Sequence, residues 1–503
     1  MSRLRKSLSA NFLGQAYGAL MGLAFVPFYV KGIGIEAYGL IGFFMTLQGL
    51  LQVLDFGLSP TMNREMARYS VQPERAAEAR DFVRSVEVCY WAIGLVIGLV
   101  IVCLAPVIAK HWLQANALPV SVVERTIAAI GIVSALQWPL SLYLGGLQGL
   151  HRQVELNTVQ ILASTLKNAG AAAVIYLVSP TITAFFAWQI LASIVQTTAI
   201  RSLLWRFVPG PREYRPRLRL DLLKDVRRFA VGVGGVAVSS LILTQLDKII
   251  LSTLLTLEQF GFYSLAASAG MAVGVVVTPV FSVVFPRLSS LVALGDEAAI
   301  AGFYHRGAQV MSVIVLPVAG VLAAFSYQIM WLWTGSAGTA ALTSPVVTAL
   351  ALGTALNGVM SVPWALQLAY GRTDLALRIH VILLTLIVPN IIILTRWYGP
   401  IGAASAWLLL NSVYLAIGPT WMHRTMLRGH GTRWLVQDVG VPALAVGIVV
   451  ITARQLMPPT LLRWEMLLVL GAVSLVTLAT AVFSAPAVRS QAQAFWRTAT
   501  SRS

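Results

Sequence analysis

The chain has 503 residues, of which 57% are hydrophobic and only 11% are charged, and its mean hydropathy is +0.78. These values exclude an ordinary soluble domain and predict an all-α polytopic membrane protein, because the short segments of alternating polarity that a membrane β-barrel needs are absent. The net charge of +17 does not indicate nucleic-acid binding, since most basic residues lie beside helix ends, where they face an anionic leaflet.

Charge-poor segments of about 20 residues mark the transmembrane helices. Fourteen spans are expected, near 10–31, 37–58, 86–109, 124–148, 157–178, 181–204, 229–255, 260–285, 307–332, 344–370, 379–395, 400–422, 439–453 and 464–484. The stretch 307–371 holds 65 residues without a single charge, so it must contain two helices and a turn.

The distribution of Lys and Arg predicts the orientation of these spans. If the N-terminus is cytoplasmic, 28 of the 36 basic residues fall in loops and tails on the cytoplasmic side, six fall outside, and two lie within spans. The first apolar run is long enough to span and lacks a convincing cleavage site, so it is interpreted as a helix and not as a signal peptide. Both termini are therefore expected in the cytoplasm.

A basic segment divides the chain into lobes. We expect an N-terminal six-helix lobe (1–205), a basic cytoplasmic linker (206–228), a C-terminal six-helix lobe (229–424), and helices 13 and 14 with a cytoplasmic tail (425–503).

Two short matches indicate that the second lobe repeats the first. Glu36-Ala37-Tyr38-Gly39 resembles Glu258-Gln259-Phe260-Gly261 at a shift of 222 residues, and Ala187–Leu191 resembles Ala406–Leu410 at a shift of 219. Six helices return the chain to the side from which it started. The two lobes are therefore predicted to be parallel and related by an axis along the membrane normal.

Loose motifs then point to a family. They are Ala37-Tyr38-Gly39, Leu54–Pro60 (Leu-Asp-Phe-Gly-Leu-Ser-Pro), Asn63-Arg64-Glu65, Gln245–Leu251 and Phe260–Ala266. With this topology the chain resembles the polysaccharide transporter, or Wzx-type, flippases of the multidrug/oligosaccharidyl-lipid/polysaccharide exporter superfamily.

The resemblance implies a multi-pass protein of the bacterial inner membrane. Its substrate would be an undecaprenyl-diphosphate-linked oligosaccharide for O-antigen, capsule or exopolysaccharide. Alternating access would move this lipid from the cytoplasmic to the periplasmic leaflet, coupled to a proton or a sodium ion. A polysaccharide polymerase and a chain-length regulator are the expected partners. The alternatives are a cation-coupled drug or metabolite antiporter and an integral membrane polysaccharide polymerase.

Among the charged residues within the expected spans, where an ion usually faces protein or water and has a partner, four stand out as candidates. Lys167 near mid-membrane either meets the diphosphate of the substrate or is structural. Asp247 and Lys248 either pair with neighbouring helices, or Asp247 titrates or gates while Lys248 meets the head group. Asp55 either couples or gates transport, or forms a salt bridge with Arg64 or another basic loop residue.

Two arginines occupy similar places in the two lobes. Arg64 and Arg287 each follow a proline near the end of a span, at helices two and eight. They either bind the diphosphate at the inward mouth or serve as ordinary positive-inside anchors.

No enzyme signature occurs in the chain: Walker A, HExxH and Gly-x-Ser-x-Gly patterns are all missing. Cys89 and Cys103 lie about 21 Å apart on one expected helix and cannot bridge. The six histidines are scattered without ligand spacing, so neither a metal site nor a cofactor is expected.

Overall fold

The computed structural model describes residues 2–53, 55, 58–211, 213–219, 221, 247–458, 461–491 and 493. Within these residues the chain is helical, and a single isolated β-bridge joins Gln114 to Thr256. The chain divides into two compact units, Met1–Gly261 and Phe262–Ser503. The expectation of an all-α membrane protein is therefore confirmed.

The first unit contains most of the N-terminal helices. They are α1 (Ser2–Ile33), α2 (Ile35–Val53), α3 (Leu58–Tyr69), η1 (Pro73–Arg75), α4 (Ala76–Val107), the π-helical η2 (Ile108–Trp112), α5 (Val120–Gln137), α6 (Leu140–Gly149), α7 (Gln153–Leu177) and α8 (Ile182–Phe207). Residues 247–254 are helical, and α10 (Leu257–Leu294) starts in the first unit and continues into the second.

The second unit contains the remaining helices, including the terminal pair. They are α11 (Glu297–Ala324), α12 (Ser326–Thr334), α13 (Ala337–Val359), α14 (Ser361–Ala369), α15 (Thr373–Tyr398), α16 (Pro400–Thr425), α17 (Gly431–Arg433), the π-helical η3 (Trp434–Gly440), α18 (Val441–Leu456) and α19 (Arg463–Ser484).

Helix length and composition agree with a membrane protein. Among the described residues, nine helical stretches are long and apolar enough to cross a bilayer, and α1 and α2 add the shorter apolar stretches Tyr17–Ile33 and Ile35–Leu51. With 38 residues, α10 is about 57 Å long, well beyond the ~30 Å hydrocarbon core, so it extends past the core or tilts within it. Of the expected span 229–255, residues up to 246 lie outside the described part of the chain.

Several expected spans are broken into two helices. The span 124–148 divides into α5 and α6 around Pro139, because proline lacks the N–H that would continue the helix and its ring disturbs the preceding turn. The span 344–370 divides in the same way at Met360, three residues before Pro363. Both breaks lie inside lengths of apolar sequence, so composition alone does not reveal them.

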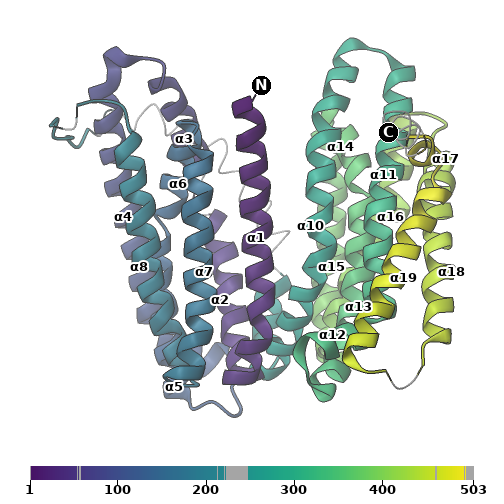
Figure 1. Ribbon diagram of the computed structural model, residues 1–503, viewed down its shortest axis with the longest axis horizontal. Coiled ribbons are helices and arrows are strands. Elements are labelled where there is room, and N and C mark those ends of the chain that lie inside the picture. Colours follow the sequence, from purple (N-terminus) through teal and green to yellow (C-terminus); the bar gives the residue numbers. More distant parts are fainter. Residues whose placement is uncertain are drawn as a thin grey trace. The chain divides into compact units, whose positions relative to one another are not determined.

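In the first unit the helices pack as a bundle. α1 lies along α7, α7 along α8, and α4 along α5 (Figure 1). The start of the basic segment is attached to α4, since Tyr214 Oη donates to Asp81 Oδ2 at 2.8 Å and the Arg219 N–H donates to Ser85 Oγ at 2.8 Å. The bond to Asp81 raises the pKa of Tyr214.

In the second unit α13 packs between α11 and α16, and the terminal helices pack on α11. α18 and α19 lie side by side at the edge of this unit (Figure 1). Their apolar core includes Val313 and Val321 from α11, Val446 from α18 and Met466 from α19. The terminal pair is therefore an integral part of the second unit.

Candidate functional site

Lys167 lies near the middle of the 25-residue helix α7. Its side chain is half-buried, and no hydrogen bond or ion pair to it is recorded among the described residues. Its neighbours on α7 are occupied with packing: Thr165 Oγ1 is 2.8 Å from Tyr17 Oη, and the Asn168 carbonyl accepts from Tyr29 Oη at 2.9 Å. Polar contacts therefore join α7 to α1 on both sides of Lys167.

Asp247 and Lys248 begin the described helical segment 247–254, and both are half-buried. Oδ1 of Asp247 is enclosed and has no hydrogen-bond partner among the described residues. The residues directly before Asp247 lie outside the described part of the chain, so its role and that of Lys248 stay predictions.

Asp55 lies between α2 and α3 and accepts three hydrogen bonds. Its Oδ1 accepts from Tyr90 Oη at 2.6 Å and from Ser141 Oγ at 2.9 Å, and its Oδ2 accepts from the Ser59 N–H at 3.0 Å. The carboxylate therefore connects the first turn of α3 to α4 and α6, which is a structural arrangement.

Arg64 and Arg287 lie in different local settings. Arg64 is on the separate helix α3, and its Nη2 is 2.7 Å from Glu65 Oε1. Arg287 is inside the continuous helix α10, is exposed, and has no recorded ion pair among the described residues. The sequence reasoning treated the two as equivalent because it did not detect that a new helix, α3, begins at Leu58.

One buried acidic residue of the first unit was missed by the sequence reasoning. Glu87 on α4 is only 1% exposed and accepts from Arg201 Nε at 2.6 Å and from Tyr143 Oη at 2.8 Å. Arg84 lies 3.1 Å from its other oxygen. The position of Glu87 inside the expected span 86–109 was a usable signal, but its partner Arg201 is 114 residues away in the sequence.

The two repeated motifs meet in space at the end of the first unit where α1 joins α2. A Cβ atom on Gly39 would lie 2.3 Å from the Leu257 carbonyl oxygen, and one on Gly261 would lie 2.3 Å from the Ile35 carbonyl oxygen. We call this contact of Ile35, Gly39, Leu257 and Gly261 the glycine crossing. Only residues without a side chain let the backbones of α2 and α10 approach so closely.

The loop after η2 is hydrogen-bonded to both helices of the glycine crossing. Both carboxylate oxygens of Glu36 accept backbone N–H groups of this loop, from Asn116 at 2.6 Å and Ala117 at 2.8 Å. The Gln114 carbonyl accepts from the Leu257 N–H at 2.8 Å. Glu36 was part of a repeat motif in the sequence, and the structure gives it this additional role.

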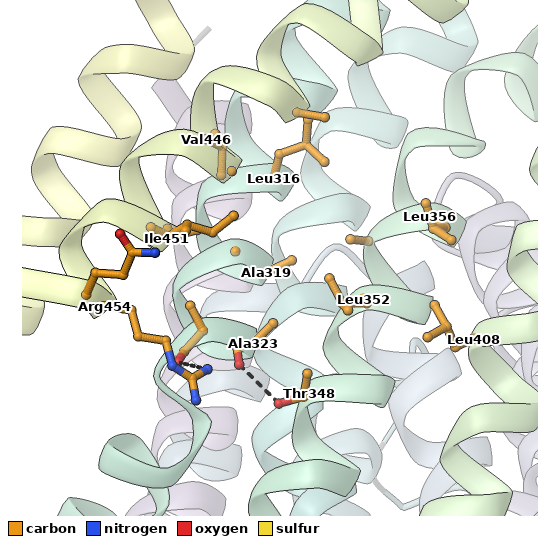
Figure 2. Close-up of a pocket in the computed structure, with 17 residues that line it drawn as sticks. Leu316, Ala319, Ala323, Thr348, Leu352, Leu356, Leu408, Val446, Ile451 and Arg454 are labelled. Atoms are coloured by element: carbon orange, nitrogen blue, oxygen red, sulfur yellow. Dashed lines mark hydrogen bonds between the residues drawn. The ribbon is translucent and has the colours of Figure 1, made fainter.

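The second unit has an apolar cavity of about 980 Å³, partly open to its surroundings, between α11, α13, α16 and α18 (Figure 2). Its walls are mainly Leu, Val, Ile and Ala side chains, with Arg454 and Gln455 at one edge. Arg454 Nη1 donates to the Ala324 carbonyl at 2.9 Å. The cavity can hold a hydrocarbon chain with a charged group near its edge.

Comparison with known proteins decides the family. The profile of a family described as "Polysaccharide biosynthesis protein" matches residues 4–292, which is more than half of the chain. The chain belongs to this family. A relative from Shigella flexneri, described as "Putative O-antigen transporter", is 21% identical over 432 residues, covering 83% of this chain and 96% of the relative.

Solved structures of two membrane transporters share the fold. The lipid II flippase MurJ in an inward closed conformation matches with a TM-score of 0.70 at 15% identity, over 95% of this chain and 98% of MurJ. An inward-facing multidrug resistance transporter of the MATE family matches with a TM-score of 0.66 at 16% identity, over 83% and 95% of the two chains. The chain therefore shares the fold of these two proteins.

Proposed function

We propose that the protein is an ion-coupled flippase that moves an undecaprenyl-diphosphate-linked oligosaccharide from the cytoplasmic to the periplasmic leaflet. In this proposal it lies in the bacterial inner membrane with both termini in the cytoplasm. The lobes 1–205 and 229–424 are related by an axis along the membrane normal, and they alternate between inward and outward access. Family membership supports the substrate class, and Lys167 is the observation that carries the proposal.

Lys167 fits the diphosphate of such a lipid. A cation at membrane depth costs roughly 2.5–3.5 kcal/mol on insertion scales, so one without a protein partner needs water or an anionic ligand to compensate it. The structure records no hydrogen bond or ion pair to Lys167 within the described residues. A diphosphate supplies several anionic oxygens and would bind the ammonium as a point charge.

The apolar cavity of the second unit fits the hydrocarbon part of the same substrate. Leu316, Leu352 and Val446 line it, and Arg454 lies at its edge. Burial of apolar chain surface contributes roughly 25 cal/mol per Å², so partial insertion of a long isoprenoid tail would stabilise the complex considerably.

The glycine crossing supplies an element that alternating access would open. The backbones of α2 and α10 approach directly at Gly39 and Gly261, so a small separation of the two helices changes this contact first. In the proposed topology the glycine crossing is at the periplasmic ends of both helices, and it would separate when the site opens outward.

The proposal is tested by replacing Lys167 in a bacterial strain that lacks its own exporter and displays surface polysaccharide only when complemented. Lys167→Ala is expected to abolish surface polysaccharide at unchanged protein abundance, and Lys167→Arg to restore part of it, because arginine keeps the charge but changes reach and geometry. Lys31→Ala, which removes an exposed lysine at the end of α1, is the matched control and should export normally. Full export by Lys167→Ala at wild-type abundance would remove Lys167 from the substrate site.

A further inference from the structure

A buried polar network in the second unit joins residues far apart in the sequence. His305 Nδ1 contacts Asp438 Oδ2, His305 Nε2 lies 2.9 Å from His430 Nδ1, and Gln309 Nε2 donates to Asp438 Oδ1 at 2.8 Å. We call these four residues the His–Asp network. They come from α11, from the residue before α17, and from η3.

The His–Asp network is enclosed in protein except at one edge. Asp438 is 0% and His305 2% exposed, whereas His430 is half-buried at the rim. A carboxylate removed from water in this way must be neutralised or well hydrogen-bonded. His430 is therefore the point at which protons can enter or leave.

The hydrogen-bond pattern around Asp438 can be assigned from its neighbours. Gln309 Oε1 accepts from the Ala487 N–H at 2.8 Å, so the amide group that faces Asp438 must be the NH₂. Both oxygens of Asp438 then act as acceptors, one from Gln309 and one from His305. This arrangement suits an ionised carboxylate beside an imidazole that carries a proton on Nδ1.

The contact between the two imidazoles leaves one proton to be shared. Only one hydrogen fits between His305 Nε2 and His430 Nδ1, so one ring donates and the other accepts. Burial and the neighbouring His305 and Arg433 lower the pKa of His430, which disfavours a positive charge on this ring. With one added proton, the positive charge on the His305–His430 pair cancels the negative charge of Asp438. Without this proton, the network has a net charge of −1.

A neighbouring histidine lacks this capacity and helps to define the site. His423 Nδ1 donates to the Pro419 carbonyl at 2.7 Å, and His423 Nε2 lies 3.2 Å from the Tyr304 hydroxyl. When the His423 ring is neutral, the Tyr304 hydroxyl is the donor to Nε2. Among the described residues, the titratable groups beside the His–Asp network include Tyr304, His423 and Arg433. Both nitrogens of His305 are engaged in hydrogen bonds, so neither is open to a metal ion. The ring can still gain or lose a proton along these hydrogen bonds.

The His–Asp network and the apolar cavity lie along the same interface, where α11 packs against η3 and α18. Gln309 precedes the cavity residue Leu316 on α11 by seven positions, and Asp438 precedes the cavity residue Ala443 by five, where η3 runs directly into α18. The Ala487 contact adds the segment after α19 to the same point. A change in charge of the network therefore acts on how α18 and α19 pack against α11.

We propose that His305, His430 and Asp438 form a proton-binding site, and that its occupancy controls the docking of α18 on α11 and hence the shape of the apolar cavity. The bound proton keeps the network neutral and the helices docked. Its loss leaves a buried negative charge, which favours separation of η3 and α18 from α11 and entry of water. In the proposed topology the site is at the cytoplasmic end of the unit and responds to cytoplasmic pH.

Two measurements on the purified full-length protein test this proposal. Infrared difference spectra between about pH 5.5 and about pH 9, a range that includes the usual histidine pKa of about 6.5, report proton exchange by imidazole and carboxylate groups. Spin labels at two exposed positions, Leu342→Cys on α13 and Ile448→Cys on α18, report the docking of α18 after Cys89 and Cys103 are replaced by serine.

The wild-type protein is expected to show an imidazole signal and, at high pH, a second and longer distance between the labels. Asp438→Asn and His305→Gln should each remove the change in distance and reduce the imidazole signal. His430→Gln, a milder change at the half-exposed rim, should reduce the imidazole signal even if the buried variants fold poorly. His111→Gln removes an exposed histidine of the first unit; it should lose only that residue's own imidazole contribution and keep the change in distance. A distance distribution that does not change with pH in the wild type, or spectra unaltered by His430→Gln, would overturn the proposal.

Discussion

Adding a single methyl group at the glycine crossing should shift the protein between conformations. In Gly39→Ala the new Cβ would lie 2.3 Å from the Leu257 carbonyl oxygen, whereas ordinary contact begins near 3.4 Å. The two backbones must therefore separate by about 1.1 Å, and Gly261→Ala makes the same demand against Ile35. Overpacking of this kind costs typically about 1–3 kcal/mol, which corresponds to roughly a 5- to 150-fold shift between two states.

The shift can be measured as the rate at which a water-soluble maleimide labels a single cysteine beside the glycine crossing. Ala37 is 2% exposed and provides the reporter position, in a protein whose Cys89 and Cys103 are replaced by serine. The labelling rate should rise by the same factor in Gly39→Ala, because it follows the fraction of open molecules. Gly274→Ala is the control, since a Cβ on this glycine of α10 meets no atom within 4 Å. Equal labelling rates in Gly39→Ala and Gly274→Ala would refute the reasoning.

Two further substitutions test the cavity and Asp55. Gly447 lines the cavity and a Cβ there meets nothing within 4 Å, so Gly447→Leu should fill the cavity and lower export severalfold without loss of stability. Gly471→Leu on α19, where a Cβ also meets nothing within 4 Å, is the control and should export normally. Equal export by the two variants, measured as surface polysaccharide per unit of protein, would show that the cavity is not needed for transport. Asp55→Asn keeps the shape of the side chain but cannot accept hydrogen bonds at both ends, so it should lower the free energy of unfolding by about 1–3 kcal/mol. Thermal unfolding in detergent measures this, and unchanged stability together with lost export would instead make Asp55 a coupling residue.

The helical class and most spans could be predicted because lipid requires long apolar segments, and these are visible in composition. The breaks were harder to predict. Pro139 divides one expected span into α5 and α6, yet Pro27 and Pro317 lie inside continuous helices. Whether a proline ends a membrane helix depends on the partners that surrounding helices offer to the freed backbone groups, and a single sequence does not show these partners.

Some candidate sites could likewise be predicted from the sequence and others could not. Lys167 was identified because a charge at membrane depth is rare and visible in the sequence. The His–Asp network was missed, since 133 residues separate His305 from Asp438 and each alone is an ordinary polar residue near a helix end. The repeat motifs were recognised as similar sequences, but only the structure shows that Gly39 and Gly261 meet.

The central claim is tested most directly by flipping of a purified substrate in proteoliposomes. A fluorescent polyprenyl-diphosphate oligosaccharide is placed in both leaflets, and a membrane-impermeant reductant removes the signal of the outer leaflet. Liposomes with the wild-type protein should lose nearly all fluorescence, as lipid from the inner leaflet reaches the reductant. Liposomes without protein, or with Lys167→Ala, should lose about half. Loss of only half with the wild-type protein, under an imposed proton or sodium gradient of either direction, would contradict the account.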